Sequence, residues 1–254
     1  MEPSSDEVPA ERAATPPADR RTLAEEILIV LALSLLASAV YAVIDLLSAP
    51  VKGVYVVSAD QSTELAKQIA GLVFGLAPVW LVAHLARRSG EGLAGFGLSW
   101  DQPRRDLLRG LVLFVIVGLG GLALYLAAVK LGVNRFVVPV PPLHHWWTIP
   151  ILLLNAATAA LLEEVIVLGY LITRLRQLGW APVAAVAASA LLRASYHLYQ
   201  GWGGFLGNLA MGALFGVLFI RWRRTWPFVI AHFLLDTAAG IGFILFRHHL
   251  PGFS

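Results

Sequence analysis

Three pairs of ionisable residues interrupt otherwise apolar stretches in the second half of the sequence. In two of them the members are four residues apart, so on an α-helix each of these pairs occupies one face. The remaining pair is adjacent in sequence, and adjacent residues on a helix point about 100° apart. We therefore expect one carboxylate of that pair to do chemistry and the other to orient a neighbour. The pairs are Glu163 with Glu164, Arg193 with His197, and His232 with Asp236.

The chemistry that such a set can perform is hydrolysis. A desolvated glutamate can act as a general base near neutral pH. Two histidines and a carboxylate are also common ligands of first-row metals, with Zn²⁺ the usual choice. This predicts a divalent metal, zinc before others, held by Glu163, His197 and His232. In the metal-free alternative, His232 and a polar partner stabilise an oxyanion directly. The residues alone leave both mechanisms open.

Arg193 requires a charged partner more than the other five residues do, because a guanidinium in an apolar run cannot lose its charge. It needs an anion, and we predict a salt bridge from Arg193 to Glu164 or Glu163. A single buried pair or a lone histidine is commonly structural. Six polar groups spread over three apolar helices instead favour convergence in the interior of a bundle.

The elements that position these residues are membrane helices. The chain is 58% apolar and 14% charged, whereas a soluble domain is roughly 25% charged. Spanning the hydrocarbon core takes about 20 apolar residues. The sequence thus predicts an all-α, polytopic transmembrane bundle of about seven spans, near 26–47, 65–86, 107–131, 149–172, 181–199, 204–221 and 227–246.

Charge distribution sets the orientation and the compartment. With a cytoplasmic N-terminus, thirteen of the nineteen basic residues fall on the inner side, as the positive-inside rule requires. The C-terminus is then expected outside, and residues 1–22 form a disordered cytoplasmic tail. The Ala/Leu/Arg-rich, lysine-poor composition suggests a bacterial cytoplasmic (inner) membrane protein in contact with the lipid bilayer. A net charge of +3 is too weak to indicate nucleic acid, and the chain has no cysteine.

Depth along the predicted spans raises a conflict. At 1.5 Å per residue, His197 would lie about 24 Å from the inner face and His232 only about 8 Å from it. We expect a tilted span, or a hairpin over 197–204 that turns inside the protein, to bring them together. Irregular backbone at membrane depth is tolerated where it lines a water-filled cavity.

Three segments that contain these pairs resemble the motifs of the CPBP family. They read EEVIVLGY (163–170), RASYHLYQG (193–201) and AHFLLD (231–236). This family, also called Abi, contains intramembrane proteases related to CAAX prenyl endopeptidases and bacteriocin-processing or immunity proteins. The resemblance implies a three-span scaffold over 23–148 and a four-helix catalytic core over 149–254. It also implies roles for the paired residues: Glu163 as the base that activates water, Glu164 as its supporting partner, His197 and His232 as metal ligands or oxyanion donors, and Asp236 as the polar residue of the third motif.

Two positions depart from the family's motifs. Leu168 replaces the arginine of the first motif, and Arg193 replaces the phenylalanine of the second. We interpret the two changes as related, since a guanidinium from another helix can still serve the two carboxylates.

The sequence thus predicts an intramembrane metalloendopeptidase that cuts a membrane peptide or membrane-associated protein. We expect its site to be reached from the cytoplasmic half of the bilayer. One alternative is a catalytically degenerate peptide-binding or immunity protein of the same fold. A proton-coupled transporter is less favoured, because the first three spans do not repeat the pattern of the last four.

Overall fold

The computed structural model describes residues 19–47, 60–132 and 145–246, and within these ranges it contains helices and no strand. The expected all-α class is confirmed. Helix α1 begins at Arg20, so the last residues of the expected tail are helical, while residues 1–18 lie outside the described part. The elements are α1 (Arg20–Ala32), α2 (Leu35–Leu47), α3 (Gln61–Gly75), α4 (Ala77–Arg88), η1 (Leu93–Phe96), α5 (Pro103–Lys130), α6 (Thr148–Glu163), η2 (Glu164–Ile172), α7 (Thr173–Gln177), α8 (Pro182–Tyr196), η3 (Leu198–Gln200), α9 (Trp202–Trp222) and α10 (Trp226–Phe246).

Fewer helices than expected are long enough to cross a membrane. Among the described residues five helical stretches qualify by length and apolarity, and a sixth qualifies if one bent pair counts as a span. The difference from seven comes mainly from α8. Its 15 residues reach about 22 Å, short of a hydrocarbon core of about 30 Å. The five are Gln61–Arg88, Pro103–Ala128, Thr148–Gln177, Trp202–Trp222 and Trp226–Phe246.

The bent pair is formed by α1 and α2, which meet at 56°. The Ser34 hydroxyl lies at the bend and donates a hydrogen bond of 2.6 Å to the Val30 carbonyl. A serine that bonds back to the carbonyl four residues earlier competes with the helical hydrogen bond there and bends the helix. The first predicted span is therefore broken in its middle.

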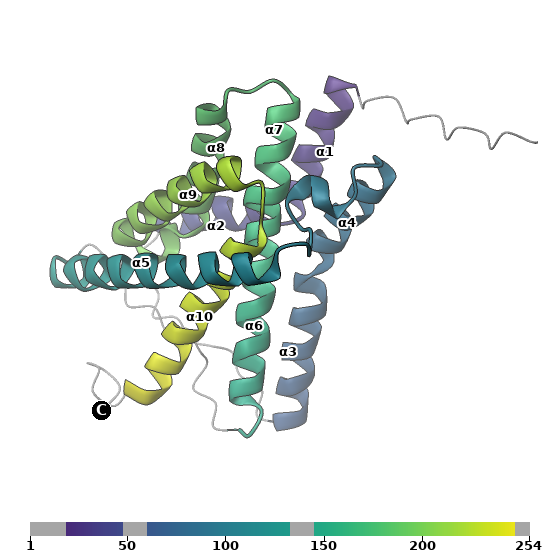
Figure 1. The fold of residues 1–254 in the computed structure, drawn as a ribbon. Helices are drawn as coiled ribbons and strands as arrows, with labels where there is room; N and C mark the ends of the chain where they lie inside the picture. The colour runs from purple at the N-terminus through teal and green to yellow at the C-terminus, as the bar shows by residue number, and fades with distance from the viewer. Residues whose placement is uncertain (1–18, 48–59, 133–144, 247–254) are drawn as a thin grey trace, which may run out of the picture.

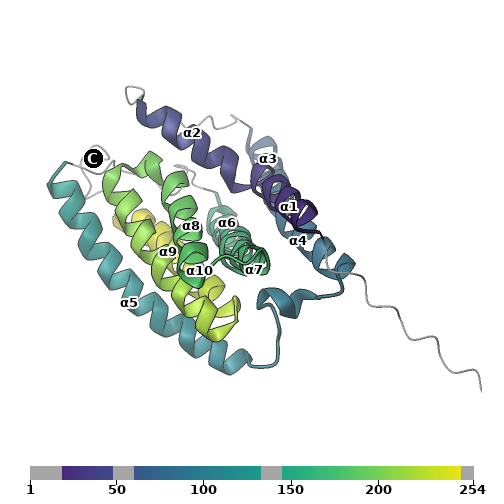
Figure 2. The same cartoon turned by 90° about the horizontal axis from the view of Figure 1, so that it is seen from above.

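The helices are arranged around one long column. Helices α6, η2 and α7 follow one another in a single line, with α3 beside α6 and α5 crossing the column (Figure 1). Viewed from above, α8 and α9 lie on one side of this column, and α1 and α4 lie on the other (Figure 2). Helix α5 packs against α10 and α9. The middle of the column is therefore enclosed, since every residue of η2 is buried.

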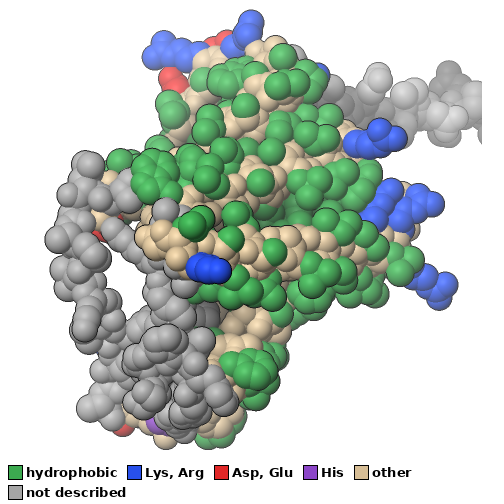
Figure 3. All heavy atoms as spheres, turned by 90° about the vertical axis from the view of Figure 1, so that its left-hand side faces the viewer, with side chains coloured by type: hydrophobic (Ala, Val, Ile, Leu, Met, Phe, Trp, Pro, Cys, Tyr) green, Lys and Arg blue, Asp and Glu red, His purple; other side chains and the backbone are tan. Residues whose placement is uncertain are grey.

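The outer surface suits a lipid solvent. Apolar side chains cover much of the face shown in Figure 3, and Lys and Arg side chains gather near its upper and right-hand margins. On α5, Leu108, Ile116 and Leu119 are each more than half exposed. Exposed apolar surface of this extent marks a membrane-facing protein. A multi-pass membrane protein follows from the apolar helices together with this surface.

The conflict of depths is resolved by where two helices begin and end. Helix α8 ends at Tyr196, and the chain turns through η3 and Gly201, whose φ is 95°. Helix α10 starts inside the molecule, because Thr225, the residue before it, is fully buried. The Thr225 backbone N–H donates to the Gly97 carbonyl at 2.8 Å, and the Thr225 hydroxyl donates to the Phe96 carbonyl at 2.6 Å. The chain turns between α8 and α9 within the expected segment, with Leu198 buried and Tyr199 and Trp202 exposed.

Candidate active site

Arg193 lies at the centre of the site and forms the predicted ion pair. Its side chain is fully buried, and Nη2 donates to Oε1 of Glu164, which is also fully buried. Nη1 lies 3.7 Å from Oε2 of Glu163. The guanidinium carbon is 5.8 Å from the centroid of the Phe215 ring. The cation that the first motif lacks at Leu168 is thus supplied from α8.

The two adjacent glutamates converge on this one guanidinium. We expected them to point in different directions, and the structure corrects this in part, since both carboxylates are within 4 Å of Arg193. Glu164 is the first residue of the π-helix η2. A π-helix adds residues to each turn and occurs frequently at functional sites. The wider turn and the two-pronged guanidinium together allow both carboxylates to reach one partner.

Glu163 is held differently from its neighbour. Its side chain is 14% exposed, and Oε2 accepts a hydrogen bond of 2.7 Å from the hydroxyl of Tyr196. Among the described residues Oε1 of Glu163 has no hydrogen-bond partner. One oxygen is therefore fixed, while the other keeps its capacity to accept a proton.

His232 is enclosed by two carboxylates. Its Nδ1 is 2.7 Å from Oε1 of Glu164, and its Nε2 is 3.4 Å from Oδ2 of Asp236. Each ring nitrogen thus faces one carboxylate, and an imidazole protonated on both nitrogens can donate to both. The side chains of Glu164, His232 and Asp236 are 0%, 6% and 41% exposed. They form a polar chain from the buried guanidinium pair to a partly exposed carboxylate.

His197 is oriented by the backbone of its own helix. Its Nδ1 lies 3.0 Å from the Arg193 carbonyl oxygen. A carbonyl can only accept, so Nδ1 carries the proton and Nε2 is the nitrogen presented to a ligand or substrate. The ring also lies near that of Tyr196, with centroids 4.7 Å apart. The structure thus brings all six predicted residues into one cluster of contacts.

The predicted metal ligands do not fit a metal ion in this arrangement. Within the described residues, no group of three His, Cys, Asp or Glu side chains is placed to hold one. In this arrangement Nδ1 of His232 contacts Glu164, and its Nε2 faces Asp236. The zinc site at Glu163, His197 and His232 remains a prediction.

Two contributors to the site were not identified from the sequence. Tyr196 directly precedes His197, but a tyrosine near the end of a membrane helix is commonly an interfacial residue. Ser189 is fully buried, and its hydroxyl donates to the Val167 carbonyl at 2.9 Å. Because η2 does not follow the α-helical hydrogen-bond pattern, this carbonyl benefits from an added donor. Ser189 therefore ties α8, which carries Arg193, to the helix that carries the glutamates.

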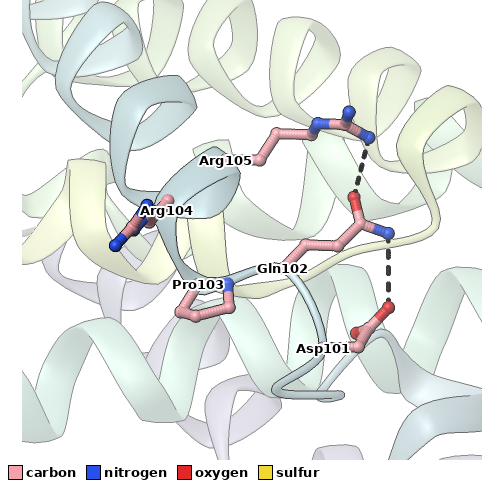
Figure 4. Close-up of a pocket in the computed structure, with 5 residues that line it drawn as sticks. All are labelled: Asp101, Gln102, Pro103, Arg104 and Arg105. Atoms are coloured by element: carbon pink, nitrogen blue, oxygen red, sulfur yellow. Dashed lines mark hydrogen bonds between the residues drawn. The ribbon is translucent and has the colours of Figure 1, made fainter.

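A surface hollow elsewhere on the molecule is separate from this cluster. It is lined by Asp101, Gln102, Pro103, Arg104 and Arg105 at the start of α5, where Arg105 donates to Gln102 and Gln102 donates to Asp101 (Figure 4). Asp101 also accepts hydrogen bonds from Ser99 and Arg224, which hold its pKa well below the usual value. None of the six predicted site residues lines the hollow.

The comparison with known families concerns the region that contains this cluster. Residues 145–238 match the family model described as type II CAAX prenyl endopeptidase Rce1-like. The match includes all six predicted residues and confirms the resemblance to the CPBP/CAAX protease family. No curated protein and no solved structure matches the chain. Residues 145–238 are thus similar to a family of membrane-embedded proteases.

Proposed function

We propose that this chain, whose residues 145–238 carry the CAAX-protease match, is an intramembrane endopeptidase in which Glu163 activates a water molecule. The observation that carries the proposal is the exposure of Glu163 together with the contacts of its carboxylate. It is a partly exposed carboxylate deep in an apolar helix, with one oxygen held by Tyr196 and a guanidinium 3.7 Å away. An oriented carboxylate with a free oxygen is what a general base requires.

The proposed reaction is hydrolysis of a peptide bond in a membrane-associated substrate. Glu163 takes a proton from water as the water oxygen bonds to the carbonyl carbon. The tetrahedral intermediate then loses the amine, which takes the proton back from Glu163 as the C–N bond breaks. The products are a carboxylic acid, which passes its proton to the released amine, and the resulting ammonium, so atoms and protons balance.

The neighbouring residues have distinct tasks in this proposal. Arg193 keeps Glu164 and Glu163 ionised side by side, since two carboxylates in a low-dielectric site otherwise repel until one is protonated. Glu164 and Asp236 hold His232 in place, so we assign His232 to charge balance. We assign Nε2 of His197 to accept a hydrogen bond from water or substrate, because its Nδ1 donates to the Arg193 carbonyl. No step passes through a metal ion.

Two alternatives to a protease are a degenerate site that binds peptides and a proton-coupled transporter. The absence of arginine at position 168 favours a degenerate site that binds peptides without cutting them. The ion pair between Arg193 and Glu164 speaks against that alternative, because it restores the missing charge from another helix. A proton-coupled transporter would use the same buried ionisable groups as a relay.

The test uses purified protein in proteoliposomes with a library of membrane peptides and product analysis by mass spectrometry. We expect the wild type to cut and Glu163→Gln to lose activity by at least 100-fold while keeping its fold, because the amide keeps the shape and lacks the basicity. Glu25→Gln is the matched control, since Glu25 is exposed on α1 and pairs with Arg21 at the surface.

Three outcomes separate the alternatives in the same preparation. Peptide binding without cleavage would support the degenerate protein, and solute uptake driven by a proton gradient would support the transporter. Metal content measured by mass spectrometry addresses the zinc prediction. About one equivalent of zinc in the wild type, lost in Glu163→Ala and His197→Ala, would support the zinc prediction and refute the metal-free mechanism.

A further inference from the structure

The site is closed on one side and open on the other, as burial along the central column shows. Every residue from Glu164 to Leu175 is buried, which covers the whole stretch from the site to the arginine-rich end of α7. In the opposite direction, residues 157–159 and 161–163 are all partly exposed. Exposure therefore begins at Glu163 and follows one face of α6, while Ala160 and Ala156 on its other face stay buried.

Helix α10 repeats this change at the same level. Val229, Ala231 and His232 are buried, and residues 233–237 are all partly exposed. The change again occurs next to a site residue. Two helices that both contribute to the site thus become accessible on the same side of it.

The closed side is sealed by residues 91–99, which we call the strap. Its Glu91 accepts a hydrogen bond of 2.5 Å from the buried Arg174 and another from Gln177. Phe96 stacks on Tyr170, with ring centroids 5.9 Å apart. These contacts cover the arginine-rich end of the column.

Two glycines, Gly169 in the column and Gly97 in the strap, make close contacts between the strap and its neighbours. A Cβ added at Gly169 would lie 2.9 Å from the Phe96 carbonyl oxygen, so this contact leaves no room for a side chain. Gly97 adopts φ 75° and approaches Thr225 equally closely. Arg224, next to Thr225, donates to the Ser99 carbonyl at 2.9 Å and forms an ion pair with Asp106 at 2.5 Å. A substrate cannot pass between the strap and the column without breaking these contacts.

The open side contains a carboxylate that lipid alone cannot accommodate. Asp236 lies ten residues after Trp226, about 15 Å along the 21-residue helix α10. Its side chain is 41% exposed. A charged group halfway along a membrane helix faces a polar opening or another protein group, because hydrocarbon is too costly. Asp236 therefore marks a polar entrance next to His232.

We propose that the substrate enters past Asp236 from the end of the molecule opposite the arginines, so that the cleaved segment comes from the leaflet on that side. The proposal rests on the proposed proteolytic function and names its substrate class. This class comprises membrane-associated peptides whose cleavable segment is presented from the non-cytoplasmic leaflet, given the predicted orientation. It replaces our expectation of access from the cytoplasmic half.

The natural absence of cysteine makes the test direct, since any introduced thiol is the only one in the chain. Single-cysteine variants are reconstituted in sealed vesicles and treated with a membrane-impermeant maleimide from one side at a time. Arg176→Cys reports the arginine-rich end, and Trp146→Cys, at 81% exposure, reports the opposite end. These two ends of the column are about 40 Å apart by helical rise. Asp236→Cys and Ala239→Cys, at an exposed position on the same face of α10, report the entrance.

We expect Asp236→Cys to react from the side that labels Trp146→Cys, at least tenfold faster than from the side that labels Arg176→Cys. Ala239→Cys gives the same answer if the first variant does not fold. Faster labelling from the Arg176 side, or no labelling of either entrance variant from either side, overturns the proposal. Labelling does not depend on cleavage, so a failure here is distinct from the failure of Glu163→Gln to lose activity.

Discussion

Replacing Arg193 tests how the site tolerates two adjacent carboxylates. In Arg193→Ala, Glu164 stays fully buried and keeps His232 as its partner, while Glu163 loses the guanidinium at 3.7 Å. Removing one member of a buried ion pair costs about 3–5 kcal/mol. At about 2–4 °C per kcal/mol for a chain of this size, the midpoint of thermal unfolding should fall by about 6–20 °C.

The assay is thermal unfolding in detergent, followed by the fluorescence of the eight tryptophans, together with peptide cleavage. Arg193→Lys should recover part of both properties, because a single ammonium lacks the fork that reaches two carboxylates. Arg193→Phe with Leu168→Arg restores the usual family residues at both positions. This double variant should cleave better than Arg193→Phe alone.

Two results would refute the reasoning about Arg193. The first is an Arg193→Ala protein whose unfolding midpoint and cleavage rate match those of the wild type. The second is a double variant that is no more active than Arg193→Phe. Either would mean that the buried guanidinium does not serve the carboxylates, and that Leu168 marks a degenerate first motif.

Further predictions concern the hydroxyl on Glu163 and the strap. Tyr196→Phe should lower kcat about tenfold with little change in KM, because it removes the hydrogen bond that orients Glu163 and does not alter a substrate contact. In the same kinetic assay, the control Tyr199→Phe should have a kcat and a KM near those of the wild type. Arg224→Ala should reduce stability by about 3–5 kcal/mol through its buried ion pair, as measured by chemical denaturation. Gly97→Ala should destabilise the protein in the same assay, since its φ is 75° and a Cβ would lie 2.8 Å from a backbone nitrogen. Gly90→Ala, with a similar φ and open space around it, should cost less.

The sequence predicted the site better than the backbone that supports it. The salt bridge of Arg193 followed from charge alone, because a buried guanidinium needs an anion and few were within reach. The six residues were found from helical spacing, which depends on local geometry. The hairpin after His197 followed from comparing depths along two spans.

Other features depend on information that apolar patterning does not contain. The apolar run at 181–199 continues past the end of α8, so hydropathy counted a span where the helix stops at Tyr196. The π-helix over Glu164–Ile172 is a change of hydrogen-bond register, and its composition resembles that of any buried helix. The strap is a loop whose contacts arise from tertiary packing. The position of Tyr196 was visible, but a tyrosine near a helix end is more commonly interfacial.

Cleavage in water enriched in ¹⁸O tests the central claim most directly. The wild type should produce a new C-terminal carboxylate that contains one ¹⁸O atom, detected as a mass increase of the N-terminal product, and Glu163→Gln should give no product. No labelled product with any peptide of the library, or equal product from Glu163→Gln, would contradict the account.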